Sequence, residues 1–158
     1  MNPEPPPCLA IPCKVMPYEP RFIEAAAQCL IETFAQPPWN ENWTPDFARE
    51  RIELITCSPA SRSWLLLGDR DEVLGALFGR KMRYLDFTEL FVDELFISHR
   101  YQRQGLGRQL IAEVSRHLRD EGMACMVLNT ERDYPSEQFY RNSGFEQIES
   151  IIMLYRNV

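Results

Sequence analysis

The segment SHRYQRQGLGRQLIAEVSRHL, residues 98–118, constrains the fold more than any other part of the chain. Apolar side chains recur in it at helical spacing, which predicts an amphipathic helix. These side chains are Leu106, Leu110, Ile111, Val114 and Leu118. The segment just before it, FTELFVDELFIS, has the length and the apolar content of a strand. The sequence therefore predicts a strand that leads through a short basic loop, with Gly105 and Gly107, into a helix.

Two helices and a hairpin are predicted ahead of this segment. LAIPCKVM, residues 9–16, is expected to form an edge strand, because proline is tolerated only where no ladder donor is needed. Apolar residues at helical spacing predict a helix over residues 21–35. Thr44 as N-cap and Pro45 at the first helical position begin a second helix. SWLLLGDRDEVLGALFGRKM then predicts two strands around a turn at residues 68–72.

Shorter elements are predicted after the amphipathic helix, whose expected C-cap is Gly122. ACMVLNT, residues 124–130, is a strand pattern. Residues 136–143 are predicted to form a short helix that Gly144 closes. FEQIESIIMLYRNV, residues 145–158, is expected to end the chain in one or two strands.

Composition excludes several classes of protein. A chain of 158 residues with 45% hydrophobic and 25% charged residues is typical of one globular domain. Apolar runs are too short to cross a bilayer and the start lacks the pattern of a signal peptide, so we expect a cytoplasmic protein with no membrane partner. The formal net charge of -6 argues against nucleic acid as a partner and mildly favours cationic ones. The five cysteines form no CxxC pair and have no nearby histidines, so neither disulfides nor a metal site is expected.

The basic loop has the composition of an anion site. Arg100, Arg103 and Arg108 surround two glycines, and the free N–H groups of a first helical turn attract negative charge. A diphosphate is the natural ligand. A dinucleotide fingerprint would need glycine at Leu110 and a turn immediately after the strand, and a Walker loop would need lysine followed by serine or threonine at Arg108-Gln109. Both alternatives fail.

Gln102-x-x-Gly105-x-Gly107, preceded by ELFISHRYQ, closely resembles motif A of the GNAT (Gcn5-related) N-acetyltransferase superfamily. FYRNSGF, residues 139–145, resembles a downstream segment of the same family, and the likeness extends over residues 9–155. The resemblance implies an α/β fold with a mixed, mostly antiparallel sheet flanked by helices, and a single domain over residues 1–158. It also implies an acetyltransferase that uses acetyl-CoA as co-substrate.

Carried over to this chain, the resemblance implies how acetyl-CoA would lie. The diphosphate would be bound by backbone N–H groups of the loop, which Gln102 would shape. The loop residues are Arg103, Gln104, Gly105, Leu106, Gly107 and Arg108. The pantetheine arm would lie along the backbone of Leu95, Phe96 and Ile97, with Asn129 close to it. The family often has an asparagine seven residues before its tyrosine, and this chain has Asp133 there.

Tyr140 resembles the general acid of the family, which protonates the leaving thiolate. A phenol is a suitable donor for a thiolate; the alternative is a tyrosine that only packs against the cofactor. Glu94, Asp93 or water alone would accept the proton of the attacking amine. Adjacent strand residues face opposite ways, so one carboxylate at most would face the acceptor unless a bulge intervenes. A backbone N–H near Phe96 or Ile97 would stabilise the oxyanion.

The acceptor is expected to be a small cationic primary amine, since this chain resembles the 6′-aminoglycoside acetyltransferase branch at Glu94 and in PPWNENW. Asp93 is then expected to contact the acceptor. Trp39 is either a substrate wall or a core anchor, and Trp43 is predicted to join the core. His99 and His117 are predicted to be structural or solvent-facing rather than catalytic. Two other functions stay open: transfer to a protein or amino acid, and a silent acetyl-CoA-binding module. The protein is expected to be a monomer or a homodimer.

Overall fold

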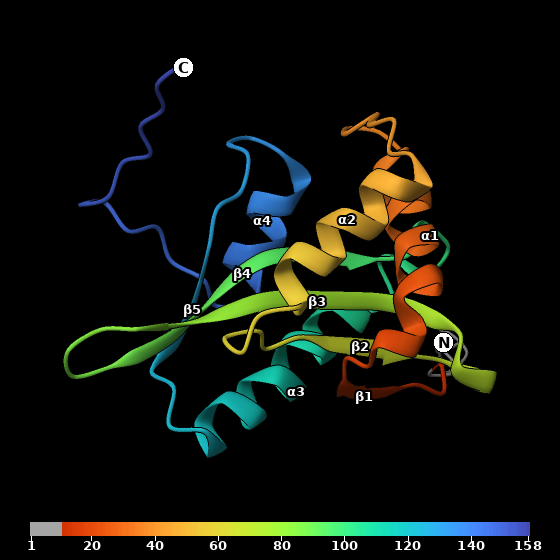
Figure 1. Ribbon diagram of the computed structural model, residues 1–158, viewed down its shortest axis with the longest axis horizontal. Helices are drawn as coiled ribbons and strands as arrows, with labels where there is room; N and C mark the ends of the chain where they lie inside the picture. Colours follow the sequence, from red (N-terminus) through yellow and green to blue (C-terminus); the bar gives the residue numbers. More distant parts are fainter. Residues whose placement is uncertain (1–10) are drawn as a thin grey trace, which may run out of the picture.

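The structure, a computed structural model, describes residues 11–158. It contains a five-stranded sheet in the order β1-β2-β3-β4-β5 (Figure 1). The strands are β1 (Lys14–Pro17), β2 (Trp64–Leu67), β3 (Val73–Arg83), β4 (Thr88–Ile97) and β5 (Cys125–Leu128). The first four pair antiparallel, and β5 pairs parallel to β4. The prediction of a mixed, mostly antiparallel sheet flanked by helices is confirmed.

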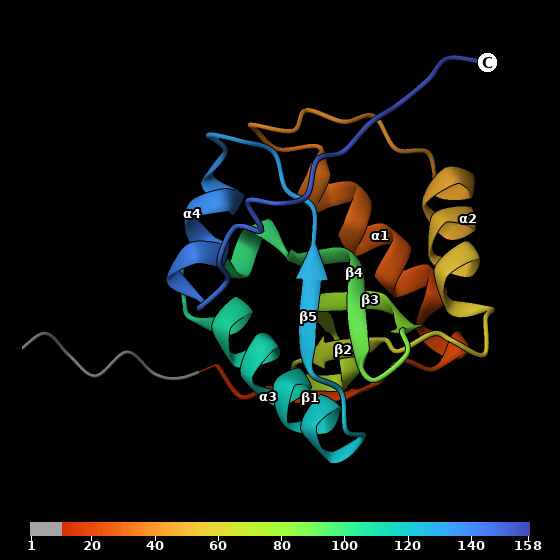
Figure 2. The same cartoon turned by 90° about the vertical axis from the view of Figure 1, so that its left-hand side faces the viewer.

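Helices cover both faces of this sheet. They are α1 (Ile23–Phe34), α2 (Pro45–Thr56), α3 (Leu106–Asp120) and α4 (Pro135–Asn142). Figure 2 shows α1 and α2 on one side of the sheet and α3 and α4 on the other. Three 3₁₀ turns complete the chain: η1 (Pro20–Phe22), η2 (Asp69–Asp71) and η3 (His99–Tyr101). None of the helices in residues 11–158 is long and apolar enough to cross a membrane.

The predicted local signals account for the starts of two helices. The Thr44 hydroxyl accepts the N–H of Phe47 at 3.2 Å, and Pro45 is the first residue of α2, as the N-cap prediction required. Gly105, with φ +81°, is the N-cap of α3. The apolar stripe of α3 is buried against the sheet, while α1 and α2 bury theirs on the opposite face. The sheet therefore separates two cores.

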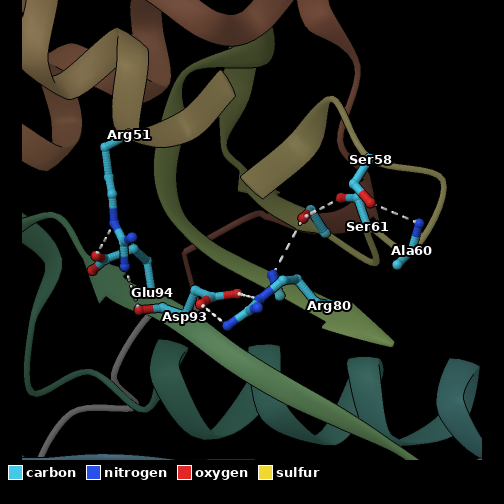
Figure 3. Close-up of polar contacts among 9 residues, drawn as sticks. Arg51, Ser58, Ala60, Ser61, Arg80, Asp93 and Glu94 are labelled. Carbon is cyan, nitrogen blue, oxygen red and sulfur yellow. Dashed lines mark hydrogen bonds and ion pairs between the residues drawn. The ribbon is translucent and has the colours of Figure 1, made fainter. Parts of the chain in front are cut away.

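A bulge and a splay in β4 shape the region that follows. Phe78 is paired with Glu94 but Gly79 with Val92, so Asp93 is an extra residue in β4. A bulge shifts the alternation of side chains by one position, and both Asp93 and Glu94 consequently lie on the face covered by α2 (Figure 3). The pairing of β4 with β5 ends at Val92 and Leu128. Within the described chain, residues 93–97 thus have no strand on that edge.

The prediction of strands at the C-terminal end is wrong. Residues 145–158 form no helix or strand, and Figures 1 and 2 show the end of the chain extending away from the sheet. Ile151, Ile152 and Leu154 are largely exposed there. Apolar composition favours a strand only where the backbone finds a ladder partner, and this segment pairs with none among the described residues. The first strand is also shorter than predicted, beginning at Lys14, and residues 9 and 10 lie outside the described part.

Candidate active site

The loop between β4 and α3 is tied to the end of β4. The Gln102 side chain donates from Nε2 to the carbonyl oxygen of Ile97 at 2.9 Å. The Tyr101 hydroxyl donates to the Glu72 carboxylate at 3.1 Å, which anchors η3 to the turn before β3. The Gln102 side chain therefore shapes the loop by donating a hydrogen bond back to the end of β4.

The backbone of this loop is suited to an anion. Arg103 and Gly105 have left-handed φ angles of 61° and 81°. No described residue accepts a hydrogen bond from the N–H groups of residues 103–108, so these donors are available to a ligand. A Cβ built on Gly105 would meet nothing within 4 Å. Arg103, Gln104 and Arg108 are exposed around the loop, whereas Leu106 turns into the core.

Gly107 leaves room for a side chain of the neighbouring helix α4. A Cβ on it would lie 2.8 Å from Cζ of Phe139 and 3.0 Å from Cε2 of the same ring. Both distances are too short for carbon atoms in contact. Gly107 thus allows α4 to pack closely on the first turn of α3, and the space beside it belongs to Phe139 rather than to a diphosphate.

Leu95, Phe96 and Ile97 lie beyond the point where β5 stops pairing with β4. Phe96 belongs to the core under α1 and α2, and Ile97 to the core on the α3 side. Their side chains are thereby fixed, while their backbone lies where β5 has ended. Asn129 follows β5 directly and is exposed beside the splay.

Glu94 is mostly buried and paired with an arginine. Nε of Arg51, in α2, donates to Oε1 of Glu94 at 2.9 Å (Figure 3), and the Glu94 side chain is 17% exposed. Burial raises the pKa of this carboxyl, and the hydrogen bond and charge of Arg51 oppose that rise. Glu94 is therefore a carboxylate in the kind of environment that tunes a base toward neutral pH.

Asp93 is occupied by a different arginine. Arg80 on β3 donates from two nitrogens to the two Asp93 oxygens, at 2.8 and 2.9 Å (Figure 3). The Asp93 side chain is 8% exposed, and the Arg80 guanidinium also lies over the Phe91 ring at 5.3 Å. A carboxylate held in this bidentate pair has little charge to offer an acceptor, so this arrangement does not favour the substrate contact predicted for Asp93.

Tyr140 lies near Glu94 although it belongs to α4. Its ring packs edge-on against Phe139 and Phe145, with centroids 5.2 and 5.5 Å away. Burial raises the pKa of Tyr140 to about 12, and the charge of Glu94 adds to the rise. The phenol therefore keeps its proton throughout the neutral range. The fold has brought the predicted acid and the predicted base into one site.

An aromatic wall of Phe34, Trp39 and Tyr134 joins the α1–α2 loop to the loop before α4. Trp39, half-buried in the loop between α1 and α2, lies 6.1 Å from Phe34 and 5.4 Å from Tyr134, ring centroid to centroid. Tyr134 comes from the loop before α4, and sequence reasoning missed it. An aromatic residue next to the helix-starting Pro135 was the available signal. Trp43 packs on the core under α1 and α2, as predicted, and its indole N–H donates to Glu41.

Other features of the chain lie away from this site. A cavity of about 520 Å³ opens between the end of β1, the end of α2 and the end of α3, and none of the predicted site residues lines it. His117 stacks on Trp64 at 6.0 Å, which agrees with a structural role. Residues 11–158 contain no group of three or more side chains able to hold a metal ion.

The fold and the site together define an α/β domain of the acetyltransferase type: a basic βα loop with free backbone N–H groups, a splayed strand edge, and a buried carboxylate whose charge acts on a buried phenol. The sequence profile of the acetyltransferase (GNAT) family matches residues 29–145. The chain belongs to this family, which confirms the resemblance drawn from motif A.

Solved structures share the fold at low sequence identity. A GNAT family acetyltransferase from Staphylococcus aureus is 13% identical with a TM-score of 0.72, covering 92% of this chain and 100% of that one. The aminoglycoside acetyltransferase AAC(6′)-Iy, bound to a CoA-containing bisubstrate analogue, is 18% identical, TM-score 0.71, with coverage of 92% and 99%. A soil metagenomic aminoglycoside acetyltransferase in complex with sisomicin is 15% identical, TM-score 0.71, with coverage of 92% and 96%. Curated proteins give no significant match.

Proposed function

We propose that the chain is an acetyl-CoA-dependent N-acetyltransferase that moves the acetyl group to a small cationic primary amine by direct attack. The observation that carries the proposal is the meeting of Glu94 and Tyr140 beside the open edge of β4, close enough for the Glu94 charge to raise the pKa of the phenol. Acyl transfer from a thioester to an amine requires a base and an acid close to one another.

Acetyl-CoA supplies a thioester carbonyl and a thiolate leaving group. The free N–H groups of residues 103–108 bind its diphosphate, with Gln102 holding the loop against Ile97. The backbone of residues 95–97 accepts the pantetheine arm at the unpaired strand edge, and Asn129 lies across that edge. An N–H near Phe96 or Ile97 stabilises the oxygen that becomes negative when the amine attacks.

Proton transfers accompany the exchange of a C–S bond for a C–N bond. Glu94 takes one proton from the acceptor ammonium, which frees the nitrogen lone pair for attack, and later releases that proton to water. The nitrogen of the new C–N bond loses its second proton to water, while Tyr140 gives its proton to the departing sulfur and is reprotonated from water. The arrangement favours Glu94 over Asp93 as base because both Asp93 oxygens are bonded to Arg80.

The aromatic wall supports a cationic acceptor. Trp39 lies in the loop that carries Glu41, whose charge acts on Glu94, and Tyr134 directly precedes α4, which carries Tyr140. Aromatic ring faces attract ammonium groups. The net charge of -6 also favours a cationic acceptor. Among proteins of this fold, a soil metagenomic acetyltransferase forms a complex with sisomicin, which supports aminoglycosides as the first class to test, with polyamines beside them.

The decisive experiment is an acetyl-transfer screen over aminoglycosides, polyamines, amino acids and peptides, with release of the CoA thiol as readout. Turnover with cationic small amines and little with peptides is the expected result. Transfer to peptides or amino acids alone would mean that the acceptor is a protein or an amino acid and not a small cationic amine. Calorimetric binding of acetyl-CoA without any transfer would favour the silent binding module.

A further inference from the structure

Arg51 joins α2 to the bulge of β4. Its Nε donates to Oε1 of Glu94 at 2.9 Å, and one terminal nitrogen reaches the carbonyl oxygen of Asp93 at 3.5 Å (Figure 3). Arg51 therefore contacts both Asp93, the extra residue of the strand, and Glu94, the residue that follows it. The described residues offer no hydrogen-bond donor to the other Glu94 oxygen, Oε2, which leaves that oxygen free to take a proton.

The surroundings of Glu94 otherwise favour its neutral form. Burial raises the pKa of the carboxyl, and nearby acidic groups raise it further. The groups that face it are Arg51 on α2, Glu41 in the loop between α1 and α2, Asp93 on β4 with its partner Arg80 on β3, and Tyr140 on α4. Arg80 is committed to Asp93, so Arg51 is the group here that directly favours the carboxylate.

We propose that Arg51 is a positioning residue for the base: it keeps Glu94 ionised, holds it on the acceptor side of the bulge, and thereby sets the lower pH limit of the reaction. This inference rests on the proposed role of Glu94. A guanidinium is well suited to the task, because it stays charged at all working pH values and fixes its partner in a plane. Removing it would leave a buried carboxyl that takes up a proton more readily.

The test compares Arg51→Gln with Arg49→Gln, a matched control on the same helix. Arg49 pairs with Glu24 on the exposed surface, away from the strand. Profiles of kcat against pH are measured with the best amine of the screen. In Arg51→Gln the acidic limb should move to higher pH, with a loss of about tenfold at its acid end and a plateau within about twofold of wild type. Arg49→Gln should leave the profile unchanged, and Arg51→Lys should restore part of the shift.

Glu94→Gln separates failure of this inference from failure of the proposed function. If the acidic limb survives in Glu94→Gln, then Glu94 is not the base. If the limb disappears in Glu94→Gln but Arg51→Gln does not move it, then Arg51 does not position the base. A uniform fall of kcat at every pH in Arg51→Gln would assign Arg51 a purely structural role and overturn the inference.

A second readout needs no acceptor. Carboxyl NMR titration of the folded protein, with the Glu94 resonance assigned by its loss in Glu94→Gln, should give a higher pKa for Glu94 in Arg51→Gln than in wild type. Arg51→Lys should lie between them, and it keeps the comparison possible if Arg51→Gln does not fold. Equal Glu94 pKa values in wild type and in the folded Arg51 variants would overturn the inference.

Discussion

Burial decides the ionisation of single residues at this site. Glu94 and Tyr140 both have raised pKa values, first because they are withdrawn from water. For the phenol the shift to about 12 stabilises the protonated form, so no loss of the acid by ionisation is expected between pH 7 and the ordinary tyrosine range near 10. For the carboxyl the same withdrawal makes ionisation harder, and Arg51 opposes this.

Tyr140→Phe keeps the ring that packs on Phe139 and Phe145 and removes only the hydroxyl. We expect kcat to fall by about a hundred- to ten-thousandfold, because general acids typically contribute in this range, while acetyl-CoA affinity changes little. Steady-state kinetics and calorimetry measure the two quantities. Unaltered kcat in an assay limited by chemistry would show that Tyr140 only packs in the site.

Trp39→Ala removes the middle ring of the aromatic wall. A cation–π contact of about 0.5–2 kcal/mol corresponds to a rise in the acceptor KM of about two- to thirtyfold. Cofactor affinity should be unchanged, and Trp39→Phe, which keeps a ring face, should retain most of the affinity. Tyr134→Ala should act in the same direction. If KM stays constant in both alanine variants, the acceptor does not lie on this wall.

At the scale of elements, the close approach of α3 and α4 positions Tyr140, the proposed acid. Tyr140 follows Phe139, and the Phe139 ring lies where a side chain on Gly107 would be. Because Gly107 has no side chain, α4, the helix that carries Tyr140, packs closely on the first turn of α3. The bulge of β4 positions Glu94 in a similar way, because it places this residue under α2, where Arg51 contacts it.

Gly107→Ala should destabilise the fold through this contact. Overpacking costs about 1–3 kcal/mol, and kcat should fall as well because α4 must shift. In a Phe139→Leu background, which removes the ring atoms that Cβ would meet, the same substitution should cost less. Urea unfolding of the four proteins of this cycle measures the coupling. Equal costs in both backgrounds would mean that Gly107 does not hold α4 in place.

At the scale of the whole molecule, an acidic protein surrounds a site proposed for cations. The net charge of -6 attracts polycations over distances that salt shortens to about 10 Å at 0.1 M. The acceptor KM for a polyamine or aminoglycoside should therefore rise with ionic strength, whereas that for a neutral amine of similar size should not. Kinetics in graded sodium chloride test this, and identical salt responses of both amines would contradict it.

Much of the fold was predictable because its signals are local. The apolar spacing of α3, the Thr44-Pro45 start of α2 and the hairpin turn depend on neighbours along the chain, and the structure has all three. The motif Gln102-x-x-Gly105-x-Gly107 is also local, and it indicates the family from the sequence alone. The sequence also predicted a basic loop with Gly105 and Gly107 that leads into the first turn of α3, and the structure has Gly105 as the N-cap of this helix.

Contacts between distant segments needed the tertiary structure. The β4 bulge, which places Asp93 and Glu94 on one face, depends on register with β3. The choice between these carboxylates depends on two arginines from other elements, Arg80 and Arg51. Tyr134 joins Trp39 only because two loops meet.

The C-terminal segment shows that local composition alone does not determine a strand. Its residues have the composition of a strand, yet residues 145–158 form none, because a strand is completed only by the backbone of another. The sequence by itself determined the elements that depend on local hydrogen bonds and apolar spacing, together with the family. Only the tertiary structure decided which carboxylate is free to act, what covers it and which strands pair, since these depend on burial and contact between residues far apart in the chain.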